Sequence, residues 1–82
     1  MNKEFEKVIH SFNNHHKDRE VVGILKVQEG IYILEAPMPN DRFAASIFVY
    51  NPSLGKEKVI VPTEDVRAFR EIKRKLMPVK EM

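Results

Sequence analysis

Four short runs rich in β-branched and aromatic residues follow one another through the middle of this 82-residue chain. They span residues 20–28, 31–36, 42–50 and 57–61. The links between them are short, whereas a parallel pair of strands needs a crossover of a dozen or more residues. The pattern therefore predicts a four-stranded antiparallel meander, and no other feature of the sequence limits the fold as strongly.

The links themselves carry turn residues. Glu29-Gly30 is a tight hairpin signal, since glycine accepts a positive φ without steric cost. Residues 37–41 contain two prolines, which stiffen the link and cannot donate to a sheet ladder. Residues 51–55 form the third link, which is also rich in turn residues, before the fourth run.

Helical periodicity appears on both sides of these runs. In residues 2–17 an apolar stripe recurs at helical spacing, with Asn2 placed to cap the helix. A second helix is expected to begin with Thr63 as its N-cap and to end before Pro78, with residues 79–82 frayed. The stripes are Phe5, Val8, Ile9, Phe12 and His16 in the first helix and Val66, Phe69, Ile72 and Leu76 in the second.

The first and third runs are apolar on both faces, unlike the strands of a sheet with one wet face. Both faces must then be covered, by helices on opposite sides, by closure into a small barrel, or by a second chain. We expect a single α+β domain over residues 1–82: helix, four-stranded antiparallel meander, helix. A small barrel of Sm or SH3 type is the alternative, suggested by Gly23 inside a strand, where sheets bend.

The two helix stripes and one face of the strands predict the core. The residues expected to be mostly buried are Phe5, Val8, Ile9, Phe12, Leu25, Ile33, Ile47, Val49, Val61, Phe69, Ile72 and Leu76.

The formal net charge is +2, and residues 63–82 account for all of it. Arg67, Arg70 and Arg74 fall within about 60° of one another on a helix, away from its apolar stripe. Such a row can meet carboxylates or phosphates through its guanidinium groups. The alternative is a solvated face, partly neutralised by pairing of Glu71 with Arg67 and Lys75.

Three further residues are candidate contacts. Tyr32 and Tyr50, if half exposed, could stack on nucleic-acid bases, while Phe43 and Phe48 are expected in the core. Met38 stands between Pro37 and Pro39, where it could dock into a partner or fold back onto its own core.

Other kinds of site are not indicated. The chain has no cysteine, and His10, His15 and His16 do not share one side of a helix, so we expect no metal. No catalytic or phosphate-cradling motif is present, so we expect no cofactor, small-molecule substrate or enzymatic activity. The sequence has no apolar run that could cross a bilayer and no apolar signal segment at its start, so we expect a soluble cytoplasmic protein without membrane contact.

These observations favour a small, non-enzymatic interaction or regulatory protein that binds another protein, with homodimer formation left open. The alternative is a nucleic-acid-binding module that uses Arg67, Arg70 and Arg74. The position of the basic side chains separates the two. A groove shared with Tyr32 or Tyr50 would favour nucleic acid, and an isolated convex row would favour protein.

Overall fold

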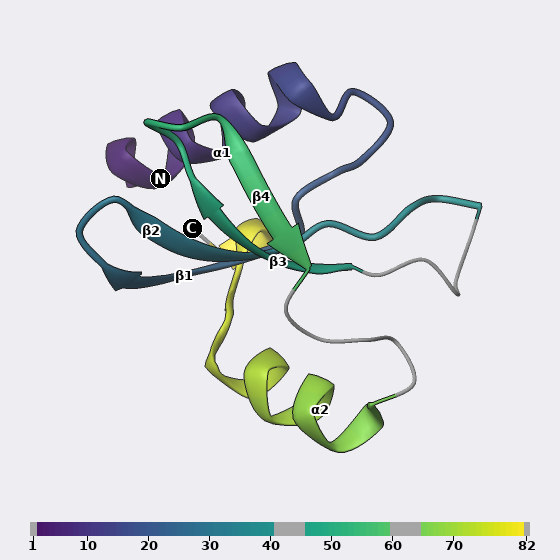
Figure 1. The fold of residues 1–82 in the computed structure, drawn as a ribbon. Coiled ribbons are helices and arrows are strands. Elements are labelled where there is room, and N and C mark those ends of the chain that lie inside the picture. The colour runs from purple at the N-terminus through teal and green to yellow at the C-terminus, as the bar shows by residue number, and fades with distance from the viewer. Residues whose placement is uncertain (1, 41–45, 60–64, 82) are drawn as a thin grey trace.

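The computed structural model describes residues 2–40, 46–59 and 65–81, and it has the expected α+β architecture (Figure 1). An N-terminal helix and a C-terminal helix flank an antiparallel sheet of five strands, one more than predicted. In chain order the elements are α1 (Lys3–His15), β1 (Gly23–Gln28), β2 (Ile31–Glu35), β3 (Ile47–Asn51), β4 (Lys56–Val59), α2 (Val66–Lys75), β5 (Met77–Pro78) and the 3-10 helix η1 (Val79–Glu81).

The sheet is open, with strand order β4-β3-β2-β1-β5 and antiparallel pairing throughout. Strands β4 and β5 form its two edges and do not pair with each other, so the small-barrel alternative is wrong. The β1–β2 hairpin turns at Glu29 and Gly30, where Gly30 has the positive φ of 78° that its sequence position predicted.

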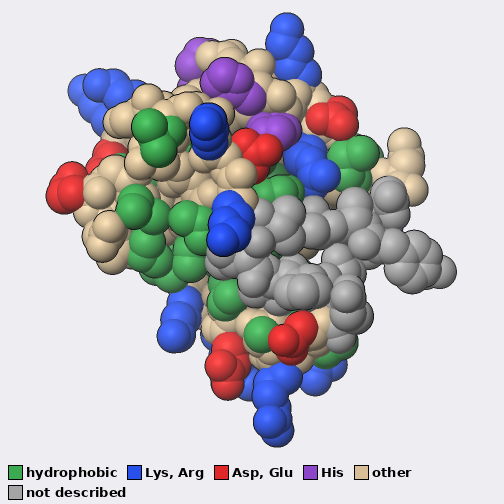
Figure 2. All heavy atoms as spheres, viewed as in Figure 1, with side chains coloured by type: hydrophobic (Ala, Val, Ile, Leu, Met, Phe, Trp, Pro, Cys, Tyr) green, Lys and Arg blue, Asp and Glu red, His purple; other side chains and the backbone are tan. Residues whose placement is uncertain are grey.

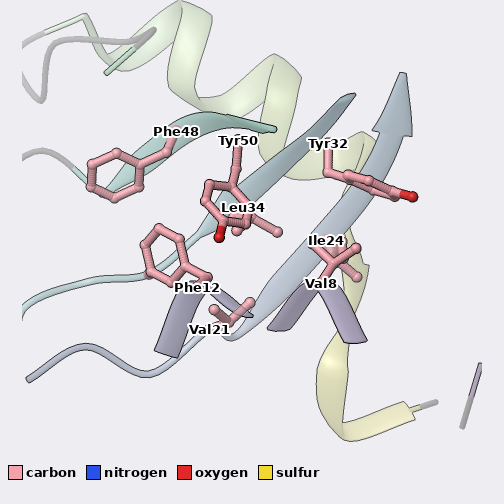
Figure 3. Packing of buried hydrophobic residues seen from close by; sticks show 9 residues of the cluster. Val8, Phe12, Val21, Ile24, Tyr32, Leu34, Phe48 and Tyr50 are labelled. Atoms are coloured by element: carbon pink, nitrogen blue, oxygen red, sulfur yellow. The ribbon is translucent and has the colours of Figure 1, made fainter. Parts of the chain in front are cut away.

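Helix α1 covers one face of the sheet. Asn2 caps it as expected, since its Oδ1 accepts hydrogen bonds from the backbone N–H groups of Glu4 and Phe5. Figure 3 shows Val8 and Phe12 of this helix among side chains of the strands. These side chains belong to the larger of two core clusters. Its buried members are Val8, Phe12, Val21, Ile24, Tyr32, Leu34, Ala36, Phe48 and Tyr50.

Helix α2 lies against the opposite face of the sheet (Figure 1). Its N-cap is Asp65, whose Oδ1 accepts from the backbone N–H of Ala68 at 3.2 Å. The expected cap, Thr63, lies outside the described residues. A smaller cluster joins α2 to the sheet: Ile47 and Leu76, with the partly buried Leu25, Ile33, Ala68, Phe69 and Ile72. The two faces of the sheet are therefore covered in the first of the three expected ways, by helices on opposite sides.

The predicted core was only partly correct. Of its members, Val8, Phe12, Ile47 and Leu76 are buried, whereas Phe5, Ile9, Leu25, Ile33, Val49, Phe69 and Ile72 are half-buried; Val61 lies outside the described residues. The prediction chose the sheet face under α2, while the larger cluster lies under α1. Because both faces are apolar in sequence, alternation alone could not identify the more deeply buried face.

The C-terminal segment is ordered by the sheet, so the expectation of a frayed end is wrong for residues 79–81. Strand β5 pairs with β1 through Gly23 and Ile24. The Val79 N–H then donates to the Val22 carbonyl at 3.0 Å, and Val79 packs against the cluster under α1. A two-residue strand containing proline leaves no recognisable strand pattern in the sequence.

Candidate partner-binding surface

The three arginines of α2 are exposed on the side of the helix that faces away from the sheet. Ala68, Phe69 and Ile72 turn inward, and the spacing of 100° per residue places Arg67, Arg70 and Arg74 opposite them. We call these three side chains the basic row. A shallow hollow of about 410 Å³ lies along it, lined by Val66, Arg67, Arg70, Glu71 and Arg74.

The basic row is not neutralised by the described part of the chain. Within residues 2–40, 46–59 and 65–81, no carboxylate oxygen forms an ion pair with the three guanidinium groups. The pairing of Glu71 with Arg67 and Lys75, which belonged to the alternative of a solvated face, is not found among these residues either. The row is thus available to an anionic group from another molecule.

Lys73 has a different role from the three arginines. Its Nζ lies 3.5 Å from Oε2 of Glu35, a carboxylate on the sheet that is only 8% exposed. The two residues border a pocket of about 370 Å³ between the sheet and the end of α2. Their ion pair helps to hold α2 on the sheet, because a buried carboxylate without a partner would be costly.

Gly23 allows the end of α2 to approach the sheet closely. A Cβ atom at this position would lie 3.3 Å from Leu76 Cβ and 3.6 Å from Glu35 Oε1. The glycine suggested a bend that closes a barrel, and this interpretation is wrong. Its function in the fold is to leave room for Leu76.

Tyr32 and Tyr50 do not share this surface. They are 5% and 0% exposed, so the half-exposed position that base stacking would require is not observed. Both belong to the cluster under α1, on the other face of the sheet (Figure 3). Their hydroxyl groups form hydrogen bonds within the chain. The Tyr32 hydroxyl donates to Glu4 Oε1, and the Tyr50 hydroxyl forms a hydrogen bond with Ser11 Oγ, each at 2.6 Å. Neither ring is placed to stack on a base.

Met38 is half-buried in the segment that follows β2. The end of the proline link at Asp41 and the expected core residue Phe43 lie outside the described residues. A contact of Met38 with a partner stays a prediction.

The histidines have structural surroundings. His16 stacks on Phe12, with ring centroids 4.5 Å apart, and its Nε2 lies 3.1 Å from Glu57 Oε1. His10 is exposed on α1. In the part of the chain that the structure describes, no group of three His, Asp or Glu side chains could hold a metal ion. No helix in that part is long and apolar enough to cross a membrane.

Among the described residues, the α1 side and the α2 side of the sheet differ in their balance of acidic and basic side chains. Around α1, the loop that follows it and the sheet face beneath it, acidic and basic residues are nearly balanced. On α2 and the sheet face beneath it, cations predominate: Lys56, Lys58, Arg67, Arg70, Lys73, Arg74 and Lys75 against Glu35, Asp65 and Glu71. Lys56 and Lys58 were not among the predicted site residues, because only the strand register places them on the α2 side.

A network of polar side chains joins α1 to the sheet on the other side of the molecule. Lys26 Nζ lies 2.8 Å from Glu4 Oε1 and 2.7 Å from Glu29 Oε1. The hydrogen bond from Lys26 lowers the pKa of the Glu4 carboxyl most, and the hydrogen bond from Tyr32 lowers it further. The hydrogen bond to Glu29 raises the pKa of Lys26 most, and the hydrogen bond to Glu4 raises it further. The hydrogen bond to Glu4 also raises the pKa of the Tyr32 hydroxyl.

Glu4→Gln should therefore destabilise the fold at neutral pH but not in acid. A carboxyl whose pKa is lowered on folding contributes stability above its ordinary pKa of 4.5 and loses it as the pH falls through the folded value. Urea midpoints at about pH 7 and about pH 3 test this, with Glu6→Gln as an exposed control on the same helix. An equal deficit of Glu4→Gln at both pH values would contradict the predicted pH dependence.

Comparison of the chain with protein-family models, with curated proteins and with solved structures finds no match in any of the three. Fold and surface together define a small α+β protein in which a basic helix lies over one face of an open antiparallel sheet.

Proposed function

We propose that this protein is a non-enzymatic interaction or regulatory protein that binds an acidic surface of another protein through the basic row. The observation that carries the proposal is the isolation of the row on an exposed helix face, unpaired by the described carboxylates. Guanidinium groups bind carboxylates in a planar, two-pronged geometry, so three of them in a row suit a carboxylate-rich surface.

Nucleic acid is the second candidate, since phosphates suit the same guanidinium groups. The burial of Tyr32 and Tyr50 under α1 argues against it, because these rings lie on the opposite face of the sheet from the basic row. The overall charge of +2 is also small for a protein dedicated to nucleic acid. We therefore favour a protein partner.

Replacing Arg67, Arg70 and Arg74 together by glutamate should abolish partner binding and leave the fold intact. The change reverses the charge of a surface that contributes little to the core. The first measurement is capture of bound protein from a nuclease-treated lysate. The second is fluorescence anisotropy at low salt with a labelled peptide of glutamate and serine. The matched control replaces the exposed Lys3, Lys7 and Lys17 on the α1 side by glutamate, which changes the charge equally.

A single-stranded oligonucleotide of similar length distinguishes the two functions. The protein-binding proposal expects weak oligonucleotide binding compared with the acidic peptide. Tight oligonucleotide binding that falls steeply with salt and is lost in the arginine variant would instead favour nucleic acid. Retention of every interaction by the arginine variant would show that the row is only a solvated face.

A further inference from the structure

Helix α2 covers only part of its sheet face. It packs on Leu25, Ile33 and Ile47, and its end lies over Gly23. The sheet continues beyond these contacts toward the β1–β2 turn. There, Val27 is 49% exposed and Ile31 and Val49 are half-buried, and all three lie next to the half-buried Ile33 at the border of the α2 contacts. We call these four residues the apolar patch.

The strand register places the patch on one face. Ile33 pairs with Val49, and Ile31 lies two residues before Ile33, so the three side chains share the face under α2. Val27 is the extra residue of a β-bulge, so that it and Gln28 both oppose Ile31. Figure 2 shows hydrophobic side chains gathered at the left of the view, above α2, with Lys and Arg side chains on both sides of them.

The charges at the border of the patch indicate what kind of molecule could cover it. Lys58 pairs with Val49 in the sheet ladder, and Lys56 pairs with Asn51 on the same face; both lysines are exposed. The outer side of α2 adds the basic row. A second copy bound by two-fold symmetry would set this patch against itself and bring its lysines together. A partner with carboxylates around an apolar centre would instead match both features.

From this arrangement we infer that the partner presents an acidic amphipathic segment, whose apolar side chains dock on the apolar patch while its carboxylates meet the surrounding lysines and the basic row. The inference rests on the proposed function and adds to it the chemistry of the partner. The basic row would supply attraction and orientation, and the apolar patch would supply selectivity for segments that combine acidic and apolar residues.

Two labelled peptides of equal length and charge test the inference. One carries leucine and glutamate at helical spacing, and the other has serine in place of every leucine. The wild-type protein should bind the leucine peptide about tenfold more tightly, since its leucine side chains would bury apolar surface on the patch and the serine side chains would not. Val27→Thr combined with Val49→Thr should remove this preference, because threonine keeps the β-branched shape but adds a polar hydroxyl.

The control for the patch variant is Leu54→Thr, which changes a side chain that is 68% exposed in the turn between β3 and β4. This variant should keep the preference for the leucine peptide. Circular dichroism and urea unfolding establish that both variants fold, so that a lost preference reports on binding.

Several outcomes would overturn the inference. Equal affinity for the two peptides would show that the patch is not a docking surface, while binding of the serine peptide through the basic row would leave the proposed function standing. If the wild-type protein bound neither peptide, the proposed function itself would be contradicted. Two other results would assign the patch differently: a dimer in sedimentation that Val27→Thr and Val49→Thr dissociate, or patch-dependent binding to vesicles of phosphatidylserine and phosphatidylcholine.

Discussion

Phe12→Ala should lower the free energy of unfolding by about 3 to 5 kcal/mol, which is a large part of the stability of a small domain. Phe12 is fully buried at the centre of the cluster under α1. Its ring lies 5.8 Å from that of Phe48 and 5.3 Å from that of Tyr50, and His16 stacks on its other side. Truncation would leave a cavity that these rigid rings cannot fill.

Phe69→Ala is the matched control, since it removes the same atoms from the other helix. Phe69 is half-buried and packs on the smaller cluster, so its truncation should cost clearly less than that of Phe12. Urea unfolding followed by circular dichroism measures both values. Equal costs, or an unchanged midpoint for Phe12→Ala, would mean that the cluster under α1 is not the main source of stability.

The fold class was predictable because the elements carry local signals. Asn2 caps the first helix, Gly30 turns the first hairpin, and short links make the strands antiparallel. Each of these signals acts within a few residues. The elements and their pairing were therefore predictable from local signals, apart from β5, whose pairing with β1 is a tertiary contact.

The candidate surface was predictable only in part. Helical spacing was enough to place Arg67, Arg70 and Arg74 on one exposed side of α2. The burial of Tyr32 and Tyr50 depends on which sheet face α1 covers, and two apolar faces do not specify that. The position of Lys58 beside Val49 depends on the register of a four-residue edge strand. These placements are long-range, and composition and spacing do not report them.

Leu76→Ala should destabilise α2 more than the rest of the molecule. Leu76 is 8% exposed and, with Ile47, forms the buried part of the cluster that holds this helix on the sheet. Truncating a buried leucine costs about 2 to 5 kcal/mol, and here the lost contacts are among those that attach a helix of ten residues to the sheet. The other described attachments of that helix are half-buried side chains and the ion pair between Lys73 and Glu35.

Native-state hydrogen exchange would show this difference directly. In Leu76→Ala the amides of α2 should lose protection well before those of β2 and β3, because a weakly attached helix opens as a local unit. Val66→Ala, at a position that is 53% exposed on the same helix, should leave protection nearly unchanged. Uniform loss of protection across the sheet would show that α2 and the sheet unfold together. If α2 does open separately, an acidic partner that holds the basic row in its helical arrangement should restore its protection, since a ligand of the folded form stabilises that form.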